Sequence, residues 1–170
     1  MYIRTIGAAA VAALVATSAY GQTVNTDSDP SAPFSTYKTY AWTTGTPALE
    51  SLGEQRIRAA VDAQLAAKGF RVATDETPDV YIATHVLTQR EPQIIANGFG
   101  PWAVGGAFGT IDVNTLVQGT LVVDMYDAKT KKMVWRGVAT DTVSDKPSKN
   151  TSRINKALAK MFRRYPPSSN

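Results

Sequence analysis

The chain has 170 residues, no cysteine, one histidine and a formal net charge of +4. This length suits a single domain, and the lack of cysteine excludes disulfides, thiol nucleophiles, zinc ribbons and a lipid-modified cysteine. The single histidine also excludes a metal centre built from several histidines. From residue 129 onward, 11 lysines and arginines accompany only two acids. The basic character therefore belongs to the C-terminal third, where such charges most often form a solvated surface.

Residues 1–21 have the pattern of an export signal. Arg4 supplies a positive charge, residues 6–16 form an uncharged run rich in alanine and valine, and Ala19 and Gly21 are the small residues that a signal peptidase reads. We predict cleavage between Gly21 and Gln22. The apolar run is shorter than the ~20 residues that a membrane span needs. We therefore expect a mature chain that is soluble in the periplasm and, without a cysteine, is not a lipoprotein.

The next segment predicts an extended entry into the domain. Residues 22–33 are polar and contain two prolines, which is typical of a lead-in that does not pack. The aromatic run Phe34–Trp42 predicts a strand from Tyr37 onward. Residues 43–47 then predict a loop.

A helix and a buried strand follow. Apolar residues at spacings of three and four predict a helix over residues 50–68, which ends before Gly69. Its predicted apolar stripe consists of Leu49, Leu52, Ile57, Ala60, Val61 and Leu65. Residues 70–73 are either a short strand or a link to the next turn. The nearly continuous apolar run over residues 80–87 predicts a strand that is covered on both faces.

Residues 89–110 predict a long loop that is rich in glycine and aromatic residues. A phosphate-binding loop requires a strand, a glycine-rich turn and a helix in succession, but Pro101 interrupts this run and a strand follows it. The sequence therefore argues against a nucleotide site. Phe99, Trp102 and Phe108 are poorly suited to water, so we expect this loop to dock on the domain or on a partner.

The C-terminal part predicts a hairpin and a second helix. Residues 111–126 and 132–144 have the composition of two long antiparallel strands, and residues 145–150 form a turn. Residues 151–165 predict a helix that Asn150 or Thr151 caps and that Pro166 ends, before a short tail at 168–170. Its apolar stripe is Ile154, Ala157, Leu158, Met161, Phe162 and Tyr165, and its basic residues are Arg153, Lys156, Lys160, Arg163 and Arg164.

The element order β-α-β-β-β-α predicts one α+β domain over residues 34–167. We expect two layers, with a mixed four-stranded sheet and both helices on one face. The first two strands should be parallel and the last two antiparallel. The hairpin register places Leu121, Val123, Met125, Met133 and Trp135 toward the helices. The opposite face then holds Val122, Asp124, Tyr126, Val134, Arg136 and Val138, where Asp124 and Arg136 can pair across the strands.

Short motifs along the chain resemble a known bacterial family. They are Asp27-Ser28-Asp29-Pro30, the run Phe34–Trp42, Lys68-Gly69-Phe70, Pro78-Asp79-Val80, Gly119–Asp124, Val134-Trp135-Arg136-Gly137 and Tyr165-Pro166-Pro167. Together they resemble the envelope family called domain of unknown function 4136, in the same order and over nearly the whole mature chain. The resemblance implies an exported or lipid-anchored envelope protein without an assigned activity.

The residues form no catalytic constellation that sequence alone can identify. His85 is mid-strand in an apolar run and is expected to be a buried structural histidine. The Asp124–Arg136 pair is either a half-exposed ion pair worth about 0.2–1 kcal/mol or a polar anchor for the glycine-rich loop or a partner. A hydrolase would instead require Asp112, Asp124, Asp141 or His85 to gather in one cleft.

We therefore expect a non-enzymatic binding or accessory module of the periplasm, with no cofactor and no nucleic-acid partner. Its partner would be an envelope protein or a component of the cell wall or outer membrane. The alternatives are a carboxylate-dependent hydrolase and a peripheral binder of anionic lipid or glycolipid. The candidate interaction surface comprises Asp124, Tyr126, Arg136, Phe99, Trp102, Phe108, Lys156, Lys160, Arg163 and Arg164.

Overall fold

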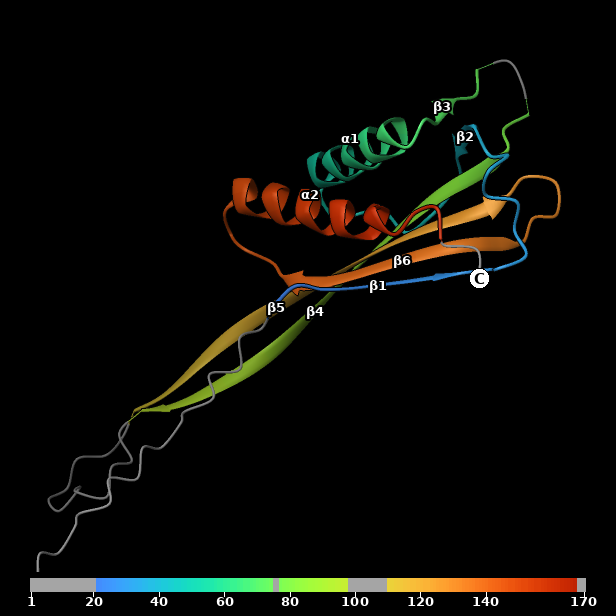
Figure 1. Ribbon diagram of the computed structural model, residues 1–170. Helices are drawn as coiled ribbons and strands as arrows, with labels where there is room; N and C mark the ends of the chain where they lie inside the picture. The colour runs from blue at the N-terminus through green and yellow to red at the C-terminus, as the bar shows by residue number, and fades with distance from the viewer. Residues whose placement is uncertain (1–20, 75–76, 98–109, 168–170) are drawn as a thin grey trace, which may run out of the picture.

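The computed structural model describes residues 21–74, 77–97 and 110–167, which form two layers (Figure 1). One layer is a six-stranded mixed sheet in the order β1-β6-β5-β4-β2-β3. The other contains the helices α1 (Ser51–Ala67) and α2 (Pro147–Arg163), which lie on the same face of the sheet. The predicted α+β class and the placement of both helices are confirmed. The strands are β1 (Thr23–Ser28), β2 (Thr39–Trp42), β3 (Arg71–Val72), β4 (Val80–Asn97), β5 (Thr110–Asp127) and β6 (Met133–Thr142).

The sheet has six strands rather than the predicted four because two short polar segments pair at its edges. The expected lead-in forms β1, which runs antiparallel to β6 and places Asp27 opposite Arg136. An edge strand such as β1 can be polar and can lie next to prolines, because it is not buried on both faces. Its sequence therefore lacks the apolar pattern that predicts a strand. The two residues of β3 pair in parallel with β2, which is itself parallel to β4 as predicted.

The two longest strands extend beyond the rest of the sheet. β4 and β5 pair along their whole lengths of 18 residues, whereas β6 ends with Thr142 opposite Gln118. Past that point the pair continues as a two-stranded ribbon away from the helices (Figure 1). The predicted loop 89–110 is therefore wrong over residues 89–97, which belong to β4, and at Thr110, which begins β5. Such a ribbon is not covered by other elements, so it lacks the apolar pattern of a buried strand.

Helix boundaries differ from the prediction mainly at α2. This helix begins at Pro147, four residues before the expected start, because proline is well suited to the first helical turn. Asn150 does not cap the helix; its side chain instead bonds the backbone N–H and carbonyl of Ser144. α1 matches its prediction closely, and Gly69 follows it with the positive φ of 85° expected of a C-terminal glycine.

The core lies between the helices and the sheet. Leu121, Val123, Met125 and Trp135 are buried beneath the helices, as the register predicted. Met133 is the exception, because an irregularity between Met125 and Tyr126 places it opposite Tyr126 and leaves it exposed. Val134, which was expected on the opposite face, belongs to the buried core cluster.

The predicted helical stripes are also largely buried. In α2, Ala157, Leu158, Met161 and Phe162 face the core, and Tyr165 joins them just beyond the helix. In α1 only Ile57, Val61 and Leu65 are fully buried. Leu49 and Leu52, which were expected in the stripe, are 94% and 57% exposed. Within the described residues, neither helix combines the length and apolar character needed to cross a membrane.

Candidate functional site

One face of the sheet has no helix or strand over it within the described residues (Figure 1). Side chains alternate along each strand, so the register identifies which residues share this face. Across β4, β5 and β6 the rows are Tyr81–Tyr126–Met133, Ala83–Asp124–Arg136 and His85–Val122–Val138. We call these nine residues the open face.

A buried ion pair lies at the centre of the open face. The Arg136 side chain donates from Nε to Oδ1 of Asp124 and from Nη2 to Oδ2, both at 2.7 Å. Asp124 is fully buried, while the side chain of Arg136 is 44% exposed. The predicted pair is confirmed, but the carboxylate is not half-exposed as expected. Two parallel charge-assisted hydrogen bonds to a buried carboxylate fix the guanidinium more firmly than a surface ion pair would.

Tyr126 and His85 complete the surroundings of the Asp124 carboxylate. The Tyr126 hydroxyl donates to Oδ2 at 3.3 Å, and His85 Nε2 lies 3.5 Å from the same oxygen. Burial, followed by the charge of Asp124, raises the pKa of Tyr126, so this hydroxyl stays protonated as a donor. The hydrogen bonds with Asp124 likewise raise the pKa of Arg136. The carboxylate thus faces three donors on one sheet face.

His85 is not the fully buried histidine that the sequence suggested. Its side chain is 31% exposed on the open face, and Nδ1 accepts a hydrogen bond from the Thr46 backbone N–H at 3.2 Å. Because Nδ1 is an acceptor, the neutral ring carries its proton on Nε2, directed at Asp124. Side chains alternate along β4, so Tyr81 and His85 share a face, and this could have placed His85 near Asp124. No local pattern in the sequence predicts the hydrogen bond between Thr46 and His85.

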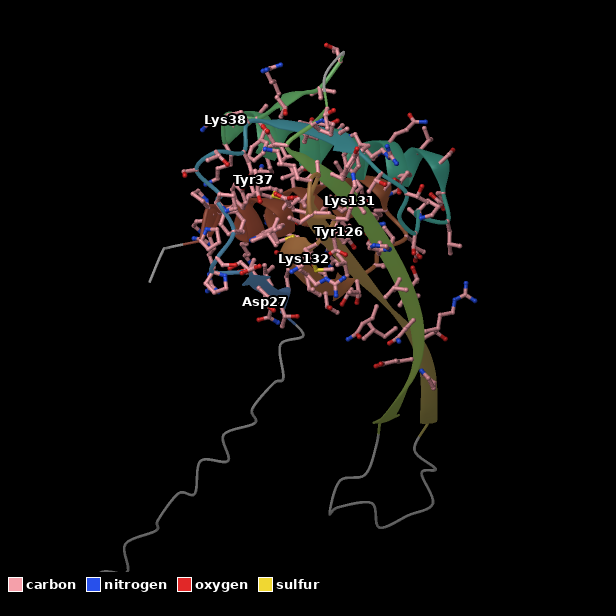
Figure 2. All side chains as sticks on the ribbon, turned by 90° about the vertical axis from the view of Figure 1, so that its right-hand side faces the viewer. Asp27, Tyr37, Lys38, Tyr126, Lys131 and Lys132 are labelled. Carbon is pink, nitrogen blue, oxygen red and sulfur yellow. The ribbon has the colours of Figure 1, made fainter. Side chains whose placement is uncertain are left out.

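The open face also carries an aromatic and cationic edge that the sequence did not predict. Lys131 lies in the turn between β5 and β6, and its ammonium is 4.6 Å from the centroid of the Tyr81 ring. Tyr81 is opposite Tyr126 in the sheet, and Figure 2 shows Tyr126 and Lys131 at the end of the sheet that holds the turn between β5 and β6. A cation over an aromatic ring fixes this turn against the open face.

The candidate acids do not converge. Asp124 is on the open face, whereas Asp141 bonds the side chain of Gln22 and lies 3.9 Å from Arg153 on the helix side. The side chain of Asp112 is outside the described part of the structure. His85 and Asp124 are brought together, but Arg136 already occupies both oxygens of Asp124. Within the described residues, no group of three histidine or acidic side chains could hold a metal ion.

The predicted interaction surface is divided between two faces of the molecule. Asp124, Tyr126 and Arg136 are on the open face. The basic residues Lys156, Lys160, Arg163 and Arg164 are exposed along and just beyond α2, in the other layer. Phe99, Trp102 and Phe108 lie outside the described residues, so the expected docking of the glycine-rich loop stays a prediction.

Fold and site together define a two-layer α+β domain with one helix-covered face and one face that no described helix or strand covers. The chain belongs to the family described as Domain of unknown function (DUF4136), whose model matches residues 24–167. The resemblance that the motifs suggested is thereby confirmed. No curated protein matches the chain.

Solved structures share the fold at low sequence identity. A PDZ domain protein from Parabacteroides distasonis is 18% identical with a TM-score of 0.54; the match covers 88% of this chain and 37% of that one. The chain therefore spans well under half the length of that protein. PelC from Paraburkholderia phytofirmans, solved as a dodecamer, is 16% identical with a TM-score of 0.51, over 84% of this chain and 99% of PelC. At these identities the likeness concerns the fold alone.

Proposed function

We propose that the protein is a non-enzymatic binding or accessory module of the bacterial envelope, and that a partner binds its open face. The family membership and the export-like N-terminal sequence support the envelope location. The observation that carries the binding proposal is the buried Asp124 carboxylate, held by Arg136 on a sheet face without a covering helix or strand among the described residues.

This arrangement suits recognition because Arg136 is oriented before any partner arrives. Asp124 engages Nε and Nη2 of the guanidinium. No hydrogen bond joins Nη1 to a described residue, so its N–H groups are available to a partner, and binding need not first order this side chain. Half-buried Val122, Val138 and Tyr126 surround it and supply apolar contact. An interface with an arginine and a tyrosine at its centre has the composition of a binding hot spot.

In-cell photo-crosslinking tests the proposal. A photoreactive residue at Val138 on the open face should give a specific adduct, which mass spectrometry identifies. The same residue at Ala159, an exposed position of α2, is the matched control and should give none. An adduct of twice the chain mass would identify the partner as a second copy. Adducts from Ala159 alone, or turnover of a defined substrate without any adduct from Val138, would overturn the proposal.

A second candidate function is peripheral binding of anionic lipid or glycolipid by α2. It is favoured by the four exposed cations Lys156, Lys160, Arg163 and Arg164, for which no ion pair with a described residue is found. Co-sedimentation with lipopolysaccharide or anionic vesicles measures this binding. If charge reversal at Lys156, Lys160 and Arg163 leaves co-sedimentation unchanged, this second candidate fails.

A further inference from the structure

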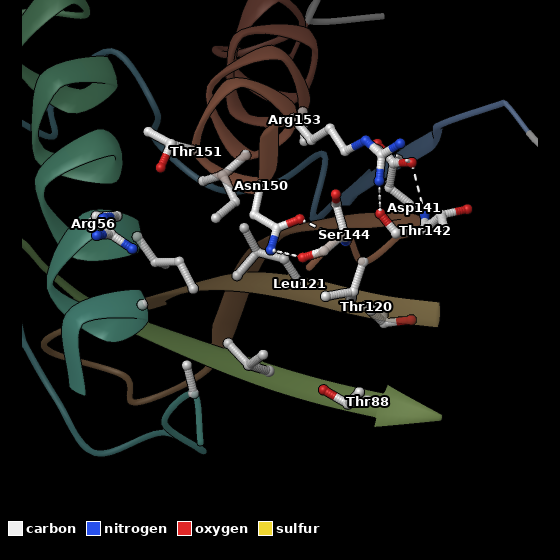
Figure 3. A pocket seen from close by; sticks show the side chains of 18 of the residues that line it. Arg56, Thr88, Thr120, Leu121, Asp141, Thr142, Ser144, Asn150, Thr151 and Arg153 are labelled. Atoms are coloured by element: carbon white, nitrogen blue, oxygen red, sulfur yellow. Dashed lines mark hydrogen bonds and ion pairs between the residues drawn. The ribbon is translucent and has the colours of Figure 1, made fainter. Parts of the chain in front are cut away.

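The helix side of the sheet contains a cavity of about 560 Å³ that the proposed function does not use. It lies between the N-terminal ends of α1 and α2 and strands β4, β5 and β6 (Figure 3). Its size falls within the range of roughly 300–1,000 Å³ that is typical of small-molecule sites. Because the open face is on the other side of the sheet, the cavity is a separate site.

The cavity has an aliphatic lining. Its apolar side chains include Leu49, Ile57, Val86, Leu121, Val143 and Ile154. No aromatic side chain is among the described residues that line it, so a sugar or a nucleobase would find no ring on which to stack. A flexible hydrocarbon chain fits such a lining, since it requires only apolar contact.

The mouth of the cavity includes one of two exposed leucines near the start of α1. Sequence periodicity predicted that Leu49 and Leu52 would pack in the core, yet both are exposed at the start of α1. Leu49 lines the cavity, and the exposed Val143 of the segment after β6 lines it as well. An apolar ligand that enters here would remove these side chains from water, which favours binding.

Polar groups on the α2 side of the cavity are already satisfied. Asn150 donates to the Ser144 carbonyl at 2.7 Å and accepts from the Ser144 N–H at 2.8 Å. Arg153 donates to the Thr142 carbonyl and lies 3.9 Å from Asp141 (Figure 3). These groups form a closed network, and they leave little demand for a polar ligand on this wall.

The opposite wall provides cationic groups. Arg56 of α1 and Arg90 of β4 are exposed in the lining, and no hydrogen bond or ion pair joins either to another described residue. Among the described residues, three carboxylates line the cavity. Asp141 lies beside Arg153, while Glu50 and Asp145 stand beside the starts of α1 and α2, where they offset the partial positive charge of a helix N-terminus. The two arginines are therefore the groups available to an anion.

We propose that this cavity binds a single-chain anionic amphiphile of the fatty-acid class. The hydrocarbon chain lies on the aliphatic lining, and the carboxylate is held at the mouth by Arg56 and Arg90. A guanidinium suits this role because it binds a carboxylate through paired N–H donors.

Calorimetric titration of the purified chain with dodecanoate tests the site. Thr88 lines the cavity opposite Gly119, which has no side chain, so Thr88→Trp should fill the space. Gln89 is the next residue of β4 and points to the other sheet face, which makes Gln89→Trp the matched control. We expect Thr88→Trp to weaken dodecanoate binding by about tenfold or more, while Gln89→Trp binds as the unchanged chain does.

The charge requirement is tested at the two arginines themselves. The double variant Arg56→Ser, Arg90→Ser should weaken binding of dodecanoate severalfold and leave binding of uncharged dodecanol unchanged. The double variant Lys156→Ser, Lys160→Ser removes the same charge from α2 and should have no effect. If Thr88→Trp does not fold, the comparison of these two double variants still tests the proposed site.

Vesicles of phosphatidylglycerol, free of fatty acid, distinguish the source of the chain. Binding of dodecanoate but not of vesicles identifies a free fatty acid as the ligand. Vesicle binding that requires Arg56 and Arg90 would instead identify a two-chain phospholipid and overturn the single-chain assignment. No saturable binding of dodecanoate, or binding that neither Thr88→Trp nor the arginine variant weakens, overturns the proposal. Neither result bears on the open face, so the proposed function stands or falls separately.

Discussion

Asp124 is the residue on which the order of the open face depends, because its carboxylate is fully buried and its main partner, Arg136, reaches the surface. Its burial could not be read from the sequence. The alternation of the hairpin predicts that Asp124, Tyr126 and Arg136 share a face, but His85 reaches the carboxylate only through the pairing of β4 with β5. Local pattern therefore predicts the pair and Tyr126 but misses His85.

The first prediction concerns Arg136→Met. This change leaves a buried carboxylate without its cation, so we expect the free energy of unfolding to fall by about 1–3 kcal/mol. The expected loss is smaller than for a fully buried ion pair, because Arg136 is partly exposed. Urea denaturation measures it. The matched control is Asp124→Leu combined with Arg136→Met, which removes both charges and should be closer to the unchanged chain. A double variant at least as unstable as the single one would contradict this explanation.

The second prediction concerns acid stability. Asp127 accepts hydrogen bonds from the N–H groups of Thr130 and Lys129 and from the Tyr37 hydroxyl, and the Thr130 N–H is the main cause of a pKa below the ordinary 3.8. Asp79 similarly has a lowered pKa, mainly because of the Lys38 N–H. These carboxylates therefore stabilise the fold above their ordinary pKa, and this contribution is lost as the pH falls through the lower folded value.

We accordingly expect the free energy of unfolding to decrease below about pH 4. Asp127→Asn should lower stability at pH 7 and make the loss on acidification smaller, because the variant has one group fewer to protonate. Urea titrations at a series of pH values between neutral and acid measure both effects. Glu91→Gln, in the exposed part of β4, serves as the control and should change neither. An acid loss of the same size in Asp127→Asn would exclude this carboxylate as its source.

At the scale of elements, α2 packs so closely on the sheet that one strand position must be glycine. A Cβ atom at Gly137 would lie 2.7 Å from Cη2 of Trp135 and 2.9 Å from Sδ of Met161. Both neighbours are fully buried, so they have little room to move. This contact fixes the distance between α2 and β6.

The third prediction is that Gly137→Ala lowers the free energy of unfolding by about 1–3 kcal/mol, because it overpacks the interface between helix and sheet. Gly53→Ala is its control: a Cβ there meets Ala48 at an ordinary 3.7 Å, and alanine favours the helix by up to about 1 kcal/mol. Thermal or urea unfolding compares the two variants. If Gly137→Ala is as stable as Gly53→Ala, the close approach of α2 is not as described.

The elements differ in how well sequence predicts them. α1 and α2 follow from apolar residues at helical spacing, and β5 and β6 follow from apolar, β-branched runs around a polar turn. β1 and the outer half of β4 do not, because an edge strand and a two-stranded ribbon bury little and need no apolar pattern. Pro147 was predicted to lie in a turn, but it begins α2, since proline is also well suited to the first turn of a helix.

At the scale of the whole molecule, the two layers separate two kinds of surface. The sheet presents a fixed ion pair with aromatic and apolar neighbours, and α2 presents Lys156, Lys160 and other cations. The sequence predicted the residues of both surfaces. It also predicted their separation, because it placed both helices on one face of the sheet and Asp124 and Arg136 on the other. The cavity was not predicted at all, because its lining comes from six separate parts of the chain.

The measurement that tests the open face most directly is lysine labelling in the cell compared with the purified chain. Lys131 reports on the open face through its contact with Tyr81, whereas Lys156 and Lys160 report on α2. An amine-reactive label with peptide mass spectrometry gives the rate at each lysine in one experiment. We predict that Lys131 is labelled severalfold more slowly in the cell, with Lys156 and Lys160 unchanged. Slower labelling of Lys156 and Lys160 with Lys131 unchanged would contradict a partner on the open face and favour the lipid-binding alternative.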